Sequence, residues 1–231
     1  MSVALRLAKA VLPDRVGKDL RRRHRAWVFK HAMRRFLADP QNSWQAMPGL
    51  IPALIYGWGN ETFSAREEYL RACLRHALVY STAILECGSG LTTVLIGALL
   101  DRSGGFLCSL EHNSEWCERV QAILDRYHIN SVQLLYAPLA SFGDYAWYGA
   151  QWEALPSTIS LVICDGPPAG TPGGRYGAVP LMRDRLKSGA VVLLDDAGRE
   201  EERAIAARWA TELGSGLEIH GQEKPYARIA V

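Results

Sequence analysis

Short apolar runs alternate with amphipathic segments through most of the chain. Five nearly continuous apolar runs, at residues 83–87, 105–111, 131–137, 158–165 and 189–196, predict strands. Strands that are apolar along their whole length are typical of a parallel sheet covered by helices on both faces. Two shorter runs, 217–220 and 226–231, bring the predicted strands to seven. The pattern therefore predicts an α/β fold with a doubly wound, mostly parallel seven-stranded sheet.

The segments between these runs carry the 3.6-residue spacing of helices. Ser64 and Glu67 form an S-x-x-E capping box that predicts a helix to about residue 76, after a glycine-rich, aromatic loop that begins near residue 55. Asn113 is the predicted cap of a helix that ends near residue 127. Further helices are predicted over residues 91–101, 176–186 and 199–213.

A different pattern occupies the first fifty residues. In "DLRRRHRAWVFKHAMRRFL", residues 19–37, apolar side chains recur at helical spacing among seven Arg and Lys residues, which predicts a basic amphipathic helix. Residues 1–50 are predicted as a helical extension and residues 51–231 as the main domain. The helix could pack on the domain or on a second subunit in a homo-oligomer, or make peripheral contact with an anionic membrane; nucleic acid is the less favoured partner.

Charge and composition sharpen this division. Residues 1–40 hold 11 Lys or Arg against three Asp, whereas the rest of the chain holds 15 against 21 Asp or Glu. A chain of 231 residues that is 48% hydrophobic is long enough to bury a full core. No apolar stretch approaches the roughly 18 uncharged residues of a membrane span. The five cysteines are odd in number and form no C-x-x-C pair, so we expect reduced core thiols and a cytoplasmic location.

Acidic residues follow four of the predicted strands. They are Glu86, Glu111, Asp165, and the neighbours Asp195 and Asp196. Ligands of doubly wound sheets bind outside the carboxyl ends of the strands. We therefore expect these five carboxylates to converge on one edge of the sheet.

The turn after the first strand, "LECGSG", restricts the kind of ligand. Gly88 and Gly90 allow a sharp turn and a close backbone approach, but Glu86 beside them would repel a phosphate. The P-loop lysine is missing, and Thr93 stands where a dinucleotide fingerprint has its third glycine, so a nicotinamide-dependent oxidoreductase is disfavoured. Glu111, 25 residues beyond Glu86, stands where such folds have a ribose-binding acid. A ribose with an ammonium or sulfonium group describes S-adenosylmethionine.

These segments resemble the class I S-adenosylmethionine-dependent methyltransferases, which have a Rossmann-like fold. "LECGSG", "SLEHN", "LLYAPL", "LVICDGPP" and "SGAVVLLDD" are similar to successive motifs of that family, over about residues 50–231. The third segment lacks the acid that many members carry near the adenine. The resemblance implies that the methionine part of the cofactor is bound by Glu86, Gly88, Ser89 and Gly90. It implies that Glu111 binds the ribose, and that the adenine is flanked by His112, Ala137 and Pro138.

The methyl acceptor is less defined. "DGPP" departs from the motif of nucleic-acid base methyltransferases, because a glycine intervenes and Ala169 replaces the aromatic residue. The overall look is nearest to bacterial enzymes with a DGPP motif, and it implies a small-molecule or saccharide hydroxyl as acceptor. We expect Asp165, with Asp195, to be catalytic.

Two mechanisms stay open at this stage. Asp165 could act as a general base, or Asp165, Asp195 and Asp196 could bind Mg²⁺ as in the similar catechol-type O-methyltransferases. Trp58, Trp147 and Tyr148 lie in predicted loops that could roof the site. The alternative function is a degenerate methyltransferase fold that serves as a binding or scaffold module through its basic helix.

Overall fold

The computed structural model describes residues 14–60 and 65–231, and the chain divides into two compact units, Met1–Ser64 and Ala65–Val231. The first unit contains α2 (Asp14–Ala38), α3 (Ser43–Ala46) and α4 (Leu50–Trp58). The helix predicted in the N-terminal region is therefore present, and it is longer than residues 19–37. The functional division at residue 50 remains our proposal, since these units describe packing alone.

α4 is stabilised by close packing against α2. Met33 and Phe36 of α2 are fully buried, and Gly57 of α4 lies so near Phe29 that a Cβ at Gly57 would be 2.7 Å from the Phe29 Cα. The loop predicted to begin near residue 55 is wrong at its start, because α4 continues to Trp58 and ends at Gly59 with φ of 78°. Glycine favours that left-handed conformation.

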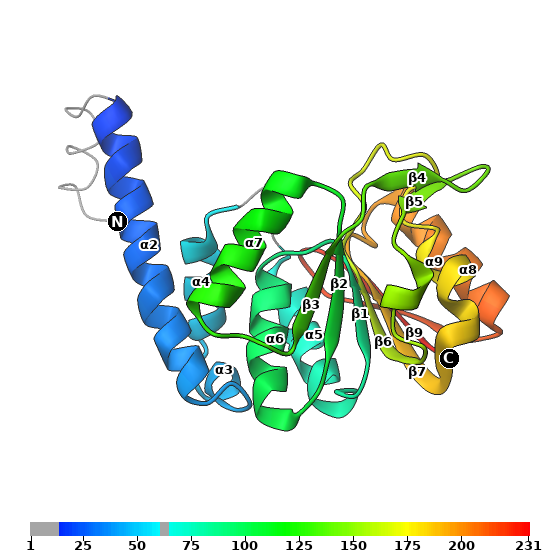
Figure 1. Ribbon diagram of the computed structural model, residues 1–231, viewed down its shortest axis with the longest axis horizontal. Coiled ribbons are helices and arrows are strands. Elements are labelled where there is room, and N and C mark those ends of the chain that lie inside the picture. The colour runs from blue at the N-terminus through cyan, green and yellow to red at the C-terminus, as the bar shows by residue number, and fades with distance from the viewer. Residues whose placement is uncertain (1–13, 61–64) are drawn as a thin grey trace. The chain divides into compact units, whose positions relative to one another are not determined.

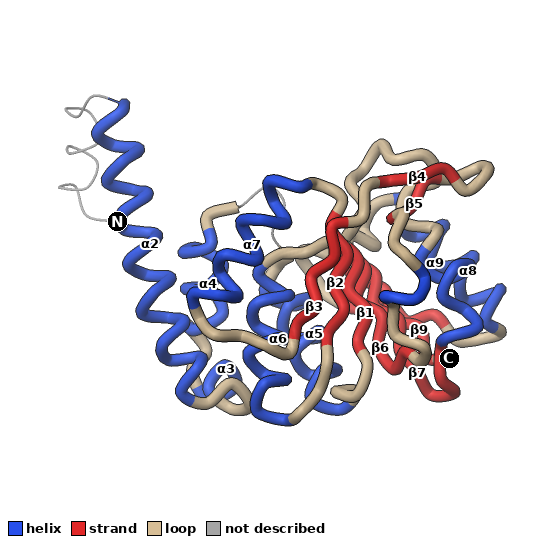
Figure 2. The backbone as a smooth tube through the Cα atoms, viewed as in Figure 1, coloured by secondary structure: helices blue, strands red, loops and turns tan. Residues whose placement is uncertain are grey.

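The second unit is built on one seven-stranded sheet of order β3-β2-β1-β6-β7-β9-β8. Its first five strands in this order are parallel, and β9 pairs antiparallel with both β7 and β8. Figure 2 shows β3, β2, β1 and β6 side by side in red. The bounds are β1 (Ile84–Cys87), β2 (Leu107–Glu111), β3 (Val132–Tyr136), β6 (Ile159–Cys164), β7 (Leu186–Leu194), β8 (Leu217–His220) and β9 (Tyr226–Ala230). The predicted fold class is confirmed, including the two terminal strands.

Helices cover both faces of this sheet (Figure 1). The helices on one face are α5 (Glu67–Val79), α6 (Leu91–Ser103) and α7 (Ser114–Arg126). The helices on the other face are α8 (Ala178–Met182) and α9 (Glu200–Leu213). Asn113 caps α7 as predicted, since its Oδ1 accepts a hydrogen bond from the Trp116 N–H at 2.9 Å. The predicted Ser64 cap lies outside the described residues, and α5 begins at Glu67. The predicted 176–186 helix is shorter, because a 3₁₀ turn, Arg183–Arg185, leads into β7.

A hairpin that the sequence pattern did not predict joins β3 to β6. Its strands β4 (Leu139–Ser141) and β5 (Ala146–Tyr148) pair antiparallel and are followed by a 3₁₀ turn, Trp152–Ala154. β5 carries Trp147 and Tyr148 into the core, where both are buried. Trp58 is buried within α4 of the first unit. The expectation that these three aromatic residues lie in loops is therefore wrong.

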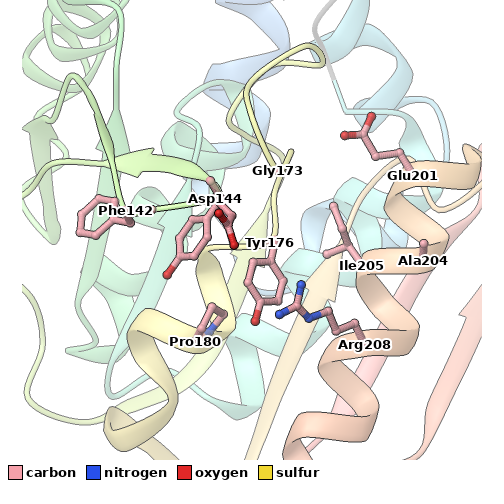
Figure 3. A pocket seen from close by; sticks show the side chains of 11 residues that line it. Phe142, Asp144, Gly173, Tyr176, Pro180, Glu201, Ala204, Ile205 and Arg208 are labelled. Carbon is pink, nitrogen blue, oxygen red and sulfur yellow. The ribbon is translucent and has the colours of Figure 1, made fainter.

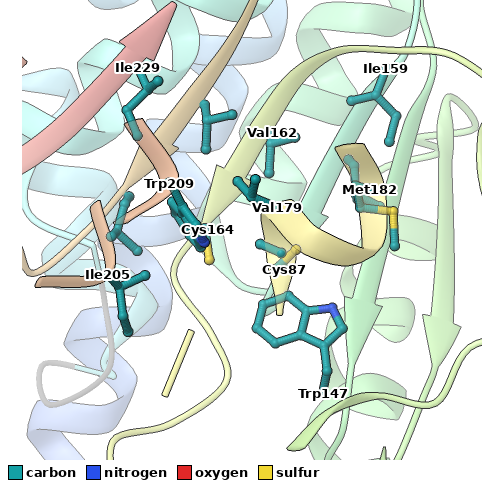
Figure 4. Close-up of a cluster of buried hydrophobic side chains, with 14 of the residues drawn as sticks. Cys87, Trp147, Ile159, Val162, Cys164, Val179, Met182, Ile205, Trp209 and Ile229 are labelled. Carbon is teal, nitrogen blue, oxygen red and sulfur yellow. The ribbon is translucent and has the colours of Figure 1, made fainter. Parts of the chain in front are cut away.

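The core between the sheet and α8 and α9 fixes the strands that carry the site (Figure 4). Val162, Met182 and Trp209 are buried there beside Trp147. Burial of each large apolar side chain stabilises the fold by about 1.5–3 kcal/mol. Among residues 14–60 and 65–231, no helix combines the length and apolarity that crossing a bilayer requires.

Candidate functional site

Backbone hydrogen bonds align the residues that follow the central strands. The Gly88 N–H donates to the Leu110 carbonyl at 2.9 Å, and the Asp165 N–H donates to the Cys87 carbonyl at 3.0 Å. The Asp195 N–H continues the ladder to the Cys164 carbonyl, also at 3.0 Å. The ends of β1, β6 and β7 are therefore level, and the side chains beyond them share one edge of the sheet, as the strand-end pattern suggested.

Glu86 is a buried acid with one oxygen bonded and one free. Its Oε2 accepts hydrogen bonds from the hydroxyls of Thr93 and Ser109, both at 2.6 Å, whereas its Oε1 is buried without a hydrogen-bond partner. Burial raises the pKa of Glu86 to about 7, although the two hydroxyls oppose the shift. Near neutral pH this carboxyl can therefore hold a proton or receive a donor from a ligand.

Gly88 and Gly90 form the turn that joins Glu86 to α6. Gly88 has φ of 94°, and a Cβ there would be 3.0 Å from the Gly166 nitrogen, so this turn lies against the segment that follows Asp165. The Gly90 N–H donates to the Thr93 hydroxyl at 2.8 Å. Thr93 stands where a dinucleotide fingerprint has its third glycine, and its hydroxyl links this turn to Glu86 by hydrogen bonds. Its spacing of three residues from the helix cap was the available signal.

Glu111 holds this turn from the neighbouring strand. Its Oε2 accepts from the backbone N–H and hydroxyl of Ser89, at 3.1 and 2.8 Å, and its Oε1 accepts from the Asn113 N–H at 2.9 Å. The Trp116 indole N–H donates to the Ser89 carbonyl at 2.9 Å. A ribose hydroxyl at Glu111 would have to share an oxygen with Ser89, so the ribose role remains a proposal.

The residues predicted to flank adenine lie along the next strand end. The Ala137 N–H donates to the Glu111 carbonyl at 2.7 Å, and the Pro138 carbonyl accepts from the Gly149 N–H at 2.9 Å. The His112 ring is edge-on to the Tyr148 ring, with centroids 6.3 Å apart. The Tyr148 hydroxyl is buried without a hydrogen-bond partner, and His112 Nδ1 lies 3.1 Å from Glu111 Oε1 without hydrogen-bond geometry. Polar atoms of this kind are typical of a ligand site.

Asp165, Asp195 and Asp196 form a second cluster at this edge. Each offers a carboxylate oxygen, and these oxygens all lie within 4.8 Å of one another. Burial raises the pKa of Asp165 to about 8, and the charge of Asp195 adds to the shift, against the opposing effects of Arg175 and Lys224. Asp165 is therefore protonated through most of the physiological range and loses its proton just above it.

Two cations that sequence reasoning missed hold this acidic cluster. The Arg175 guanidinium lies 3.3 Å from Asp165 Oδ1 and 2.9 Å from Asp196 Oδ2. The Lys224 ammonium lies 2.6 Å from Asp195 Oδ2 and 3.0 Å from Asp196 Oδ1. Neither residue has a motif or spacing that links it to the acids, because the contacts form only in the folded chain.

The second unit also contains an open cavity of about 580 Å³. It is lined by the hairpin turn, by the loop around Tyr176 and by one side of α9, and Figure 3 shows Phe142, Tyr176 and Arg208 in its wall. The Arg208 guanidinium lies 3.7 Å from the centroid of the Tyr176 ring, whose hydroxyl donates to Glu212 at 2.7 Å. None of the residues predicted from sequence lines this cavity. Tyr176 nevertheless follows directly after Arg175.

The chain is similar to known methyltransferases. Residues 85–197 match the family model of a methyltransferase domain. A Staphylococcus aureus protein assigned as a caffeoyl-CoA O-methyltransferase is similar in structure, with a TM-score of 0.62 at 14% identity over 81% of this chain and 95% of that chain.

Two further crystal structures that contain S-adenosylhomocysteine are also similar. The Podospora anserina methyltransferase PaMTH1 has a TM-score of 0.55 at 14% identity, over 95% of this chain and 97% of that chain. A Bacillus cereus O-methyltransferase has a TM-score of 0.53 at 13% identity, over 74% and 84%. No curated protein sequence matches the chain. At these identities the structural likeness establishes the fold.

Proposed function

We propose that this protein, which its family match and fold identify as a class I S-adenosylmethionine-dependent methyltransferase, methylates a hydroxyl oxygen of a small molecule or saccharide. The observation that carries the proposal is the meeting of the glycine turn and the acidic cluster at one edge of the sheet. Gly88 of the turn lies against the backbone that follows Asp165. A cofactor at the turn would thus adjoin a group that can accept a proton.

The residues at the turn suit S-adenosylmethionine. Glu86 Oε1 is a buried acceptor without a partner, which fits the cationic methionine end, and a side chain at Gly90 would meet no atom within 4 Å, so the turn leaves room there. We assign the methionine part to Glu86, Gly88, Ser89 and Gly90. The ribose we assign to Glu111, and the adenine to His112, Ala137 and Pro138. When bound, this cofactor supplies an electrophilic methyl group on its sulfonium.

Asp165 is our choice of general base. Methyl transfer from sulfur to oxygen is a displacement in which the acceptor hydroxyl loses its proton as the new bond forms. A base with a pKa near the working pH is suited to that step, and the pKa of Asp165 is raised to about 8. Asp195 and Asp196 would then position Asp165 and the cations, since their own oxygens contact Lys224 and Arg175.

A magnesium site fits these residues poorly. Carboxylate oxygens are suitable ligands for Mg²⁺, and they must lie about 2.0–2.1 Å from the ion. Here Arg175 and Lys224 already contact oxygens of all three acids at 2.6–3.3 Å. We therefore derive no step through a metal and propose the metal-free base mechanism.

The cavity lined by Tyr176, the residue after Arg175, is our candidate site for the non-reacting part of the acceptor. Its wall combines aromatic rings, such as Tyr145 and Tyr176, with the charged groups of Asp144, Glu201 and Arg208. Pockets of this kind bind through apolar contact and orient the ligand with a few polar groups. A saccharide ring fits this combination, because it has apolar C–H faces and hydroxyl edges.

Two further proposals concern the whole chain. The exposed basic residues of α2 suit peripheral contact with an anionic membrane, and a homo-oligomer is the other partner that this helix could serve. The cysteines of the described segments are unpaired, and most are buried, which supports a reducing compartment and thus a cytoplasmic location.

A labelled-methyl assay tests the function. The full chain is incubated with S-adenosylmethionine labelled in the methyl group, with phenols, monosaccharides and lipid-linked glycans in separate reactions. We expect transfer to a hydroxyl, and we expect Tyr145→Ala to raise the KM for that acceptor while the affinity for S-adenosylhomocysteine stays unchanged. Glu111→Ala should weaken S-adenosylhomocysteine binding by about 1.5–3 kcal/mol. Binding without transfer to any acceptor would contradict the enzyme assignment and leave a binding module.

A further inference from the structure

We propose that Arg175 and Lys224 take the place of a divalent metal ion among Asp165, Asp195 and Asp196. Methyl transfer by this protein would then need no metal. The part that concerns methyl transfer rests on the proposed function, whereas the part that concerns metal exclusion rests on the cluster alone.

The two cations contact one oxygen of Asp165, one of Asp195 and both of Asp196, whereas Asp195 Oδ1 is buried without a hydrogen-bond partner. Arg175 Nη2 lies 3.3 Å from Asp165 Oδ1 and 2.9 Å from Asp196 Oδ2. Lys224 Nζ lies 2.6 Å from Asp195 Oδ2 and 3.0 Å from the second oxygen of Asp196. Charge-assisted hydrogen bonds of this length are strong. A divalent ion bound to the same oxygens would stand within repulsive distance of both cations.

Both cations are built into the fold. Arg175 is almost fully buried, and its Nη1 also donates to the Asp195 carbonyl at 2.9 Å. Lys224 belongs to the turn before β9, which is anchored by the hydrogen bond from the Gln222 N–H to Glu68 of α5 at 3.0 Å. The Arg175 guanidinium therefore cannot leave the acids without a change in packing, whereas the Lys224 side chain, which is 26% exposed, is held by its two ion pairs.

The charges of the cluster are balanced by the protein itself. Arg199 adds a third cation, 3.2 Å from Asp196 Oδ2. Although burial lowers the pKa of Lys224, the carboxylates of Asp195 and Asp165 raise it above its ordinary value, so the ammonium stays charged. Three cations therefore lie against the cluster, one of them shared with Glu202 at 3.2 Å, and little negative charge is left uncompensated to attract a hard metal ion.

In the proposed reaction these two cations would influence the pKa of the base and hold its neighbours in place, as a metal ion does in other enzymes. Lys224 and Arg175 lower the pKa of Asp165 against the effect of its burial, which keeps the base within reach of neutral pH. They also fix Asp195 and Asp196, so the base has rigid neighbours. Both are thus positioning residues that act through Asp165.

A manganese titration separates this arrangement from a metal site. Binding of Mn²⁺ to the full chain is measured at pH 7.5 by electron paramagnetic resonance, for the native protein, Lys224→Met and Lys224→Arg. We expect no bound Mn²⁺ up to about 1 mM in the native protein or in Lys224→Arg, because the ammonium or guanidinium holds the oxygens. Lys224→Met should gain a site, and the double variant Lys224→Met/Asp196→Ala should lose it.

Each outcome decides the proposal. Binding of Mn²⁺ by the native protein that Asp196→Ala removes would overturn it, and so would failure of a folded Lys224→Met to bind the ion. Where thermal melting shows that Lys224→Met is unfolded, Lys224→Gln replaces it. In the methyl-transfer assay, the native protein should keep its activity in EDTA; a loss that Mg²⁺ restores would also overturn it. If no acceptor is methylated, the proposed function fails while the Mn²⁺ result still stands.

Discussion

Two opposing effects act on the protonation of Glu86. It is buried, which favours the protonated form, and it is bonded through one oxygen to two hydroxyls, which favours the charged form. Its other oxygen has no partner. A buried acceptor left unpaired costs about 1–3 kcal/mol unless it is protonated or a ligand supplies a donor. We attribute this arrangement to the cationic end of the cofactor.

Cofactor binding should therefore release protons from Glu86. Because its pKa is about 7 in the free protein, the carboxyl is partly protonated at pH 7, and a bound cation favours the ionised form. Calorimetry with S-adenosylhomocysteine at pH 7, in phosphate and in Tris, should give heats that differ by the ionisation heat of the buffer. The difference should vanish in Glu86→Gln and decline above pH 8. Equal heats for the native protein in the two buffers would remove Glu86 from the methionine end.

Asp165 should control the pH dependence of turnover. The base works only when it is deprotonated, so the rate should rise with pH through an inflection near 8 and then level off. Lys224 lowers the pKa of Asp165, and Lys224→Met should therefore move the inflection to higher pH, whereas Lys224→Arg should leave it near the native value. The measurement is kcat from pH 6 to 10 at saturating cofactor. An inflection that stays in place in Lys224→Met would mean that Lys224 has only a structural role.

The packing of α6 on the sheet depends on a glycine within the helix. A Cβ at Gly97 would collide with Val132 Cγ2 of β3 and lie 2.7 Å from Ile129 Cγ2. Both methyl groups stand on branched β-carbons, which have few rotamers to turn away. The distance between α6 and β3 determines the position of α6, and α6 begins at the turn of Gly88 and Gly90. Gly97 therefore affects the position of this turn without contacting it.

Gly97→Ala should destabilise the protein by about 1–3 kcal/mol, because the clash outweighs the better helix propensity of alanine. Gly17→Ala, the matched control in α2, should be neutral or stabilise its helix by up to about 1 kcal/mol, because a Cβ there meets no atom within 4 Å. Urea denaturation followed by circular dichroism measures both changes. A Gly97→Ala protein as stable as the native one would contradict the packing of α6 on β3.

Long periodic elements were predictable, and short ones were not. The sequence pattern predicted every strand of the main sheet, because each is an apolar run between polar turns. It missed β4 and β5, which have three residues each and too little periodicity to distinguish from a loop. It also missed α4, whose "IYGW" segment was assigned to a loop and contains the glycine that fits against Phe29.

The site was predictable as far as its residues follow strands. The carboxylates after β1, β2, β6 and β7 share an edge because parallel strands end together, and motif order alone pointed to them. Arg175 and Lys224 contribute through contacts whose partners lie in other turns, and no local spacing encodes those pairs. For this reason the sequence suggested a metal among the three aspartates but not the two cations that contact them.

At the scale of the whole chain, charge is divided between the two ends of the sequence. Residues 1–40, which include α2, hold 11 Lys or Arg against three Asp, whereas the rest of the chain holds 15 against 21 Asp or Glu. Val16, Leu20 and Trp27 share one side of this helix, by their spacing, and are 43%, 53% and 59% exposed. An apolar stripe among arginines is the pattern of helices that lie at an anionic membrane surface.

The full chain should therefore bind vesicles that contain phosphatidylserine and should bind phosphatidylcholine vesicles weakly. Each basic residue near such a surface contributes about 1 kcal/mol, so replacing Arg21, Arg22 and Arg23 by Gln should weaken binding by about 100-fold. Trp27→Ser should weaken it through loss of apolar contact, while Trp152→Ser, at an exposed tryptophan of the second unit, should not. Co-sedimentation at low and high salt measures these changes, and binding should decline as salt rises because the attraction is screened. If the same arginines instead govern binding to duplex DNA, the helix serves a nucleic acid and the membrane proposal fails. If Trp27→Ser converts a dimer to a monomer without affecting vesicle binding, the helix serves a second copy of the chain and the membrane proposal also fails.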